Sequence, residues 1–84
     1  MKTYEECLNS VRDVLVEHCN VTVEPIDENL HLQSDLGLDS MALLNLALEI
    51  ENKFELCLEE DPEQPPETVG QVARLVVQRL EDIQ

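Results

Sequence analysis

Ser40 is the residue best placed to do chemistry in this chain of 84 residues. It ends the turn-like segment 35–39, and a long apolar run over 41–54 follows at once. Serine is a preferred helix N-cap because its hydroxyl accepts a hydrogen bond from an N–H of the first turn. Asp39 beside it favours the positive end of the helix dipole. We therefore expect Ser40 to cap a helix at the surface, with its hydroxyl available for attachment of a bulky anion.

The other candidates for catalysis or metal binding lack the partners that such chemistry needs. Neither histidine, His18 or His31, stands in a recognisable triad context with Ser40. The three cysteines form no Cys-x-x-Cys pair, so neither zinc nor a disulfide framework is expected. No glycine-rich phosphate loop occurs, and the acidic residues after position 35 do not match a calcium loop. The pattern predicts a substrate of enzymes and not an enzyme, with no catalytic residue and no metal site.

Charge is the strongest global feature, with 19 acidic against 5 basic residues and a net charge of −14. This excess argues against nucleic-acid binding through phosphate neutralisation and against anionic membrane surfaces. It favours basic protein partners that the field would steer inward, although solubility alone would also explain it. No apolar run is long enough for a membrane span, and the N-terminus lacks the apolar region of a signal peptide. A cytoplasmic protein is expected.

Apolar residues recur at helical spacing in three segments. The expected helices span about 4–18, 41–54 and 69–82. Thr3 with Glu6, and Thr68 with Gln71, fit capping boxes at the starts of the first and third segments. Cys7 and Cys19 lie within or beside the first apolar pattern, which is typical of small buried hydrophobic residues.

Two connections join these segments. Residues 20–39 carry many apolar side chains, so we expect this long loop to lie over the core. The segment 61–65 could form one short turn of helix before Pro65 and Pro66 end it. The chain is thus predicted to be all-α, a small three- to four-helix bundle in a single domain over 1–84, with a long loop between the first two helices.

The second helix has two apolar faces. Placing its residues at 100° intervals gives a core stripe; its members are Leu43, Leu46, Ala47, Ile50 and Phe54. Met41, Leu44 and Leu48 fall on the other side. We expect these three residues to form a face on which partners dock, unless the segment 55–67 folds over them.

The motif residues resemble the acyl carrier protein family. Leu-Gly-Leu-Asp-Ser-Met at 36–41 is followed by Leu46 and by Glu-Ile-Glu-Asn-Lys-Phe at 49–54. The resemblance implies that Ser40 carries a 4′-phosphopantetheine arm, joined from coenzyme A by a phosphopantetheinyl transferase. It implies an acyl group held on the arm as a thioester. It also implies a monomeric carrier whose partners are acyl-loading, condensing and modifying enzymes with basic surfaces, which would meet Asp39 and the three exposed apolar residues.

Other functions stay open at this point. The same motifs also resemble D-alanyl carrier proteins and the carrier domains of peptide synthetases. In the competing class, the chain is an unmodified acidic adaptor and Ser40 only a cap. Fatty-acid carriers usually line this helix with acids, whereas Asn45 and Asn52 occupy the outward sector here. This departure favours a carrier of a specialised pathway over the housekeeping fatty-acid carrier. The resemblance leaves the partner enzymes as those of fatty-acid, polyketide or related biosynthesis.

Overall fold

The structure is a computed structural model that describes residues 3–23, 25–58 and 66–82. These residues form three α-helices and no strand. The helices are α1 (Tyr4–His18), α2 (Ser40–Phe54) and α3 (Val69–Asp82). The predicted all-α class is confirmed. The turn of helix considered for 61–65 lies outside the described residues.

Threonine hydroxyls cap the amino ends of two helices, as the sequence predicts. Thr3 Oγ1 accepts a hydrogen bond of 3.2 Å from the N–H of Glu6 at the start of α1. Thr68 Oγ1 accepts one of the same length from the N–H of Gln71 at the start of α3. The Gln71 side chain in turn accepts from the N–H of Glu67, at 2.7 Å. The two threonine bonds satisfy N–H groups that a helix start leaves without a partner.

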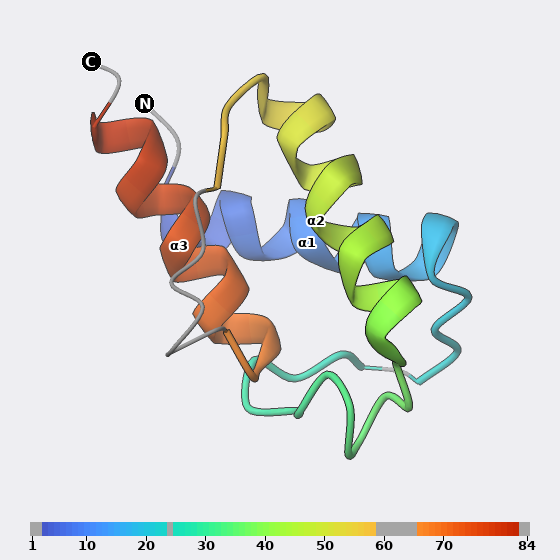
Figure 1. The fold of residues 1–84 in the computed structure, drawn as a ribbon. Coiled ribbons are helices and arrows are strands. Elements are labelled where there is room, and N and C mark those ends of the chain that lie inside the picture. The colour runs from blue at the N-terminus through green and yellow to red at the C-terminus, as the bar shows by residue number, and fades with distance from the viewer. Residues whose placement is uncertain (1–2, 24, 59–65, 83–84) are drawn as a thin grey trace.

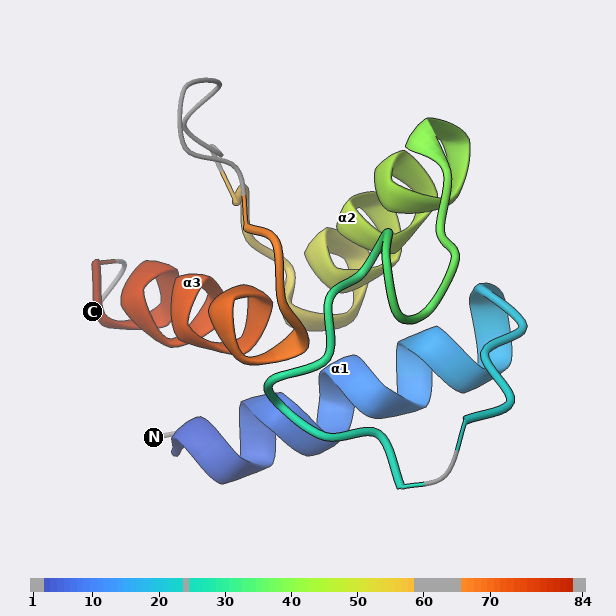
Figure 2. The ribbon, with the colours of Figure 1, turned by 90° about the horizontal axis from the view of Figure 1, so that it is seen from below.

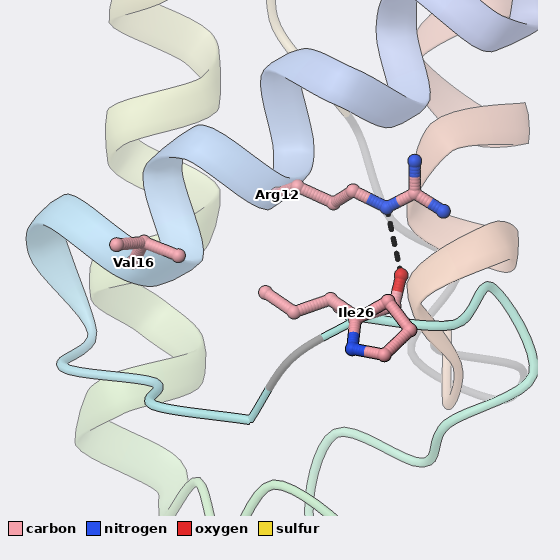
Figure 3. Close-up of a pocket in the computed structure, with 4 residues that line it drawn as sticks. Arg12, Val16 and Ile26 are labelled. Atoms are coloured by element: carbon pink, nitrogen blue, oxygen red, sulfur yellow. Dashed lines mark hydrogen bonds between the residues drawn. The ribbon is translucent and has the colours of Figure 1, made fainter.

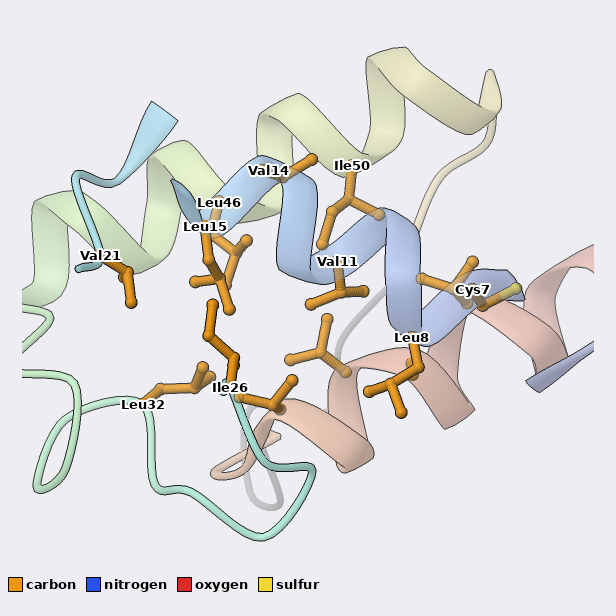
Figure 4. Packing of buried hydrophobic residues seen from close by; sticks show 14 of the residues in the cluster. Cys7, Leu8, Val11, Val14, Leu15, Val21, Ile26, Leu32, Leu46 and Ile50 are labelled. Atoms are coloured by element: carbon orange, nitrogen blue, oxygen red, sulfur yellow. The ribbon is translucent and has the colours of Figure 1, made fainter. Parts of the chain in front are cut away.

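Helix α1 is the helix against which the other two helices pack. Both α2 and α3 lie on the same side of α1 and pack against it, but they make no close backbone approach to each other (Figures 1 and 2). The core forms where aliphatic side chains of the three helices and of the connections meet (Figure 4). Its largest fully buried side chains are Cys7, Val11, Leu15, Ile50, Leu58, Val69 and Val76. Burial of such side chains is the main stabilising term in a domain of this kind.

The long loop covers one end of the core, as expected from its apolar residues. Val21, Ile26, Leu32 and Leu38 are buried. Val23, in contrast, is 41% exposed. The side chain of Arg12 also ties the loop to α1, because its Nε donates to the carbonyl of Ile26 at 2.7 Å.

Backbone hydrogen bonds attach the same loop to the start of α3. The N–H of Gly70 donates to the Glu28 carbonyl at 2.8 Å, and the N–H of Val69 donates to the Leu30 carbonyl at 3.1 Å. A Cβ at position 70 would lie 2.9 Å from the Tyr4 hydroxyl and 3.0 Å from the Glu28 carbonyl oxygen. The close approach of α1, the loop and α3 therefore requires glycine here.

Self-repulsion of the acidic surface should limit stability. With a net charge of −14, carboxylates on this small bundle repel one another in the compact state. Added salt or divalent cations should therefore raise the melting temperature, and alkaline pH at low salt should lower it. Thermal unfolding followed by circular dichroism across a salt series measures this. A melting temperature that does not respond to salt would show that repulsion is not limiting.

Candidate functional site

A short turn with a fixed backbone leads the chain to Ser40. The N–H groups of Asp35 and Leu36 both donate to the His31 carbonyl, at 3.0 and 3.1 Å, and the N–H of Gly37 donates to the Gln33 carbonyl at 3.1 Å. Gly37 has a φ of 71°, in the left-handed region that glycine occupies without strain. The glycine of the motif therefore lets the chain turn out of the loop into α2.

Asp39, and not Ser40, caps α2, so the predicted capping role of Ser40 is wrong. Asp39 has an extended backbone, and its Oδ1 accepts from the N–H of Ala42 at 2.8 Å. Ser40 is the first residue inside the helix and is exposed. Both residue types are good caps, and the extended backbone of Asp39 directly before the helical Ser40 gives the role to Asp39. The Ser40 hydroxyl therefore does not make the capping bond.

An anion attached to Ser40 would meet the amino end of α2. Asp39 takes the N–H of Ala42, while the N–H groups of Ser40 and Met41 have no partner within the helix. The helix dipole adds a partial positive charge at the same place. The exposed hydroxyl and the free N–H groups fit a phosphodiester. The Asp39 carboxylate adds a negative charge that a basic partner could neutralise.

Three apolar side chains continue along α2 from Ser40 and face solvent. Met41 is 77% exposed, Leu44 61% and Leu48 50%. In contrast, Leu46 and Ile50 are buried. The rest of the predicted core stripe (Leu43, Ala47 and Phe54) is partly buried against the core. No charged residue occurs from 40 to 48, although the chain as a whole is 29% charged. We call Met41, Leu44 and Leu48 the exposed stripe.

Polar contacts join the end of α1 to α2. His18 Nε2 lies 3.5 Å from Glu49 Oε2. The Asn45 side chain donates to the His18 carbonyl at 3.2 Å, which satisfies a carbonyl that the end of α1 leaves free. Sequence periodicity places Asn45 on the outward sector but does not show this long-range bond. Cys19 is only partly buried, unlike fully buried Cys7. Burial and then the Glu49 carboxylate raise the pKa of the Cys19 thiol.

Two adjoining hollows lie beside the first turns of α2. The inner cavity has a volume of about 70 Å³ and only apolar lining residues: Leu32, Leu43, Leu46, Ala47, Ile50, Leu58, Pro66 and Val72. The outer hollow has about 400 Å³, and its lining is His31, Leu32, Gln33, Ser34, Leu43, Pro66 and Glu67. Three residues, Leu32, Leu43 and Pro66, line both. Leu43 stands one helical turn after Ser40, so the hollows begin close to the candidate site.

A third hollow lies on another surface, between α1 and the long loop. Arg12, Val16, Pro25 and Ile26 line this open hollow of about 650 Å³ (Figure 3). It shares no lining residue with the two hollows beside α2. The Arg12 guanidinium at its edge is held by the Ile26 carbonyl and by Asn9 Oδ1, at 2.7 and 3.0 Å. Its polar group is thus engaged in fixing the loop.

Within the described ranges, no group of three or more histidine, cysteine, aspartate or glutamate side chains could hold a metal ion. In the same part of the chain, no helix combines the length and apolarity needed to cross a bilayer.

Comparison with known proteins identifies the family of this chain. The model of the phosphopantetheine attachment site family matches residues 9–61, more than half of the chain. The chain belongs to the acyl carrier protein family. An acyl carrier protein of Amoebophilus asiaticus is 33% identical over 75 residues, which cover 89% of this chain and 94% of that protein. One from Wolinella succinogenes is 31% identical over 68 residues, covering 81% and 90%.

A solved structure agrees with this assignment. The acyl carrier protein of Enterococcus faecalis superposes with a TM-score of 0.70 at 28% identity, over 93% of this chain and 99% of that one. The predicted family and fold are confirmed, and so is 4′-phosphopantetheine as the prosthetic group of this carrier protein. The function is that of an acyl carrier protein, and the aminoacyl-carrier and adaptor alternatives are not favoured. Membership of the family implies that biosynthetic enzymes are its partners.

Proposed function

We propose that Ser40 is the attachment residue of the arm and that this carrier protein has no catalytic activity of its own. The main support for this proposal is that Ser40 is exposed at the first position of α2, directly after the cap Asp39. In the attachment step, Ser40 Oγ forms a bond to the phosphorus that bears the pantetheine. The pyrophosphate bond of coenzyme A breaks, and adenosine 3′,5′-bisphosphate leaves. The hydroxyl proton passes to a base on the transferase.

Local geometry supports this proposal in two ways. The Ser40 hydroxyl does not serve as the cap, so modification does not break a bond that holds α2. The amino end of the helix favours the negative charge that the phosphodiester brings. The arm's terminal thiol would then hold the acyl group as a thioester for partner enzymes to load, condense and modify.

Intact mass spectrometry tests the proposal. The protein is incubated with coenzyme A and a broad-range phosphopantetheinyl transferase, and its mass should rise by one phosphopantetheine unit. An unchanged mass under conditions that modify a known carrier protein would favour the acidic adaptor instead.

The exposed stripe is the proposed docking face for these enzymes. Met41, Leu44 and Leu48 follow directly from Ser40, so any enzyme that reaches the arm there also meets them. Apolar groups that are exposed together commonly mark interaction sites. Asp39 uses Oδ1 for the cap, and its carboxylate retains acceptor capacity for a basic residue of the partner. The proposed partner surface is therefore apolar at its centre and basic at its edge.

Electrostatic steering should speed association with such partners. The net charge of −14 attracts a basic surface at long range, and dissolved salt reduces the range of this attraction. Stopped-flow association rates with the transferase should fall steeply as salt rises, because screening acts beyond about 8 Å at physiological ionic strength. A rate that stays constant with salt would leave solubility as the role of the charge.

We also propose that the carrier protein is a monomer in the cytoplasm.

A further inference from the structure

We propose that the open hollow between α1 and the long loop is a second docking surface of this carrier protein. Its partner is a protein segment that presents a carboxylate beside apolar side chains. The described residues that line the hollow are Arg12, Val16, Pro25 and Ile26 (Figure 3). None of them lies on α2, so the proposal does not depend on the residue to which the arm is attached.

Arg12 supplies the charge that selects the partner. It is the only lysine or arginine between residue 3 and residue 52 of a chain with 19 acidic side chains. Among the described residues, however, no aspartate or glutamate forms an ion pair with Arg12. Because this part of the chain does not neutralise the charge, the complementary group is a carboxylate of another molecule.

The guanidinium of Arg12 is held in place and still has donors to offer. Its Nε donates to the Ile26 carbonyl at 2.7 Å, and its Nη1 donates to Asn9 Oδ1 at 3.0 Å. A guanidinium has five N–H groups, so these bonds leave others for a carboxylate. Since the bonds already fix the side chain, binding of a partner costs little of its conformational entropy.

The rest of the hollow is apolar. Val16 is 50% exposed and Pro25 is exposed, while Ile26 is buried. Val23, two residues before Pro25 in the loop, is 41% exposed. In the described part of the chain, Val16 and Val23 are the large apolar residues that are exposed apart from the exposed stripe. Exposed apolar side chains beside an arginine are typical of a protein interface.

The width of the hollow favours a protein over a small molecule as its occupant. The hollow is open to solvent and has a volume of about 650 Å³. Sites for small molecules bury about 70–90% of the ligand surface, which an open hollow does not achieve. A protein segment covers the hollow together with its rim. It therefore excludes water from the contact with Arg12 and strengthens that contact.

The hollow lies on the side of α1 that is turned away from α2. Val14 of α1 faces α2, because it lines another hollow together with Glu49. Two residues correspond to about 200° around a helix, so Arg12 and Val16, two residues before and after Val14, point to the opposite side. In Figure 3, α2 accordingly lies behind α1. One protein can therefore hold the carrier at this hollow while another acts on Ser40.

An NMR titration of the ¹⁵N-labelled protein tests the proposal. The probe is the blocked tripeptide acetyl-Leu-Glu-Leu-amide, which should shift the amide signals of Arg12, Val16 and Ile26 along a saturating curve. Acetyl-Leu-Gln-Leu-amide lacks the carboxylate and acetyl-Gly-Glu-Gly-amide lacks the leucines, so both should bind about tenfold more weakly or less. The net charge of −14 repels any acidic peptide, so binding of the probe requires a specific contact.

Matched variants locate the binding. Arg12→Gln should weaken binding of the probe about tenfold, whereas Arg74→Gln, which removes an equal charge on α3, should leave it unchanged. Val16→Glu places a repelling carboxylate in the hollow and should also weaken binding, with Gln78→Glu on α3 as its control. Because Val16 is exposed, this second pair keeps the test decisive if loss of the Arg12 bond to the loop impairs folding.

Several results would overturn the proposal. The absence of a saturable shift, or equal binding to Arg12→Gln and Arg74→Gln, would remove the carboxylate site. Signals that shift along the exposed stripe and not around the hollow would place the peptide on α2. Hexanoate that binds as tightly as the peptide would assign the hollow to free carboxylic acids and not to a protein.

A final measurement tests whether the two surfaces are separate. Saturating probe should leave the rate of phosphopantetheine attachment unchanged, and inhibition would contradict a docking surface separate from α2. Failure of the proposed function is distinct from failure of this inference, because the titrations measure binding to the unmodified protein and involve no step at Ser40.

Discussion

Replacing Ser40 with alanine should abolish phosphopantetheine attachment completely while leaving the helical circular dichroism largely unchanged. The Ser40 hydroxyl is the proposed acceptor of the phosphopantetheine, and alanine offers no oxygen in its place. Folding should persist because Asp39, and not Ser40, caps α2 and because Ser40 is exposed. Intact mass after incubation with coenzyme A and transferase measures the loss.

The natural controls are the other serines. Ser10 lies within α1, and Ser34 lies in the turn before Gly37 with no helix start after it. Ser10→Ala and Ser34→Ala should both be modified as fully as the unchanged protein. Continued labelling of Ser40→Ala would place the arm elsewhere and refute the assignment.

Alanine substitutions at Ile50 and Leu48 of α2 should show which of the two residues belongs to the core and which to the proposed docking face. Ile50 is 0% exposed, so Ile50→Ala should lower the free energy of unfolding by about 2–5 kcal/mol. Leu48 is 50% exposed, so Leu48→Ala should change it by less than about 0.5 kcal/mol. Denaturant unfolding of the two variants gives both values. Because a domain of this size is only modestly stable, the unfolded fraction of Ile50→Ala should be much larger than that of the unchanged protein.

Leu48→Ala should impair function although it leaves stability almost unchanged. Transfer of the arm to Ser40, or thioester loading of the modified protein, should slow while folding is intact. Leu44→Ala is the matched second variant, since Leu44 is 61% exposed on the same face. If Leu48→Ala unfolds as readily as Ile50→Ala, Leu48 belongs to the core and the docking face loses its support.

The sequence could predict the helices because local signals agree there. Threonine caps and apolar periodicity mark α1 and α3, and the hydroxyls of Thr3 and Thr68 do accept the expected bonds. The capping residue of α2 is harder to predict from the sequence, because Asp39 and Ser40 are adjacent and both residue types are good caps. The folded backbone, which is extended at Asp39 and helical from Ser40, decides between them.

Features that depend on contacts between distant segments could not be predicted. The apolar residues of the long loop predict its burial, but not that the Glu28 carbonyl meets the N–H of Gly70 at the start of α3. Likewise, Asn45 bonds to the His18 carbonyl, 27 residues away in the chain. The hollows beside α2 combine residues from several elements, so periodicity within one helix does not reveal them.

Tandem mass spectrometry of peptides from the modified protein tests the central claim most directly. After incubation with coenzyme A and transferase, the peptide that contains Asp39-Ser40-Met41 should carry one phosphopantetheine, and fragmentation should assign it to Ser40. Peptides that contain Ser10 or Ser34 should be unmodified. An arm located on any residue other than Ser40, or on none, would contradict the account.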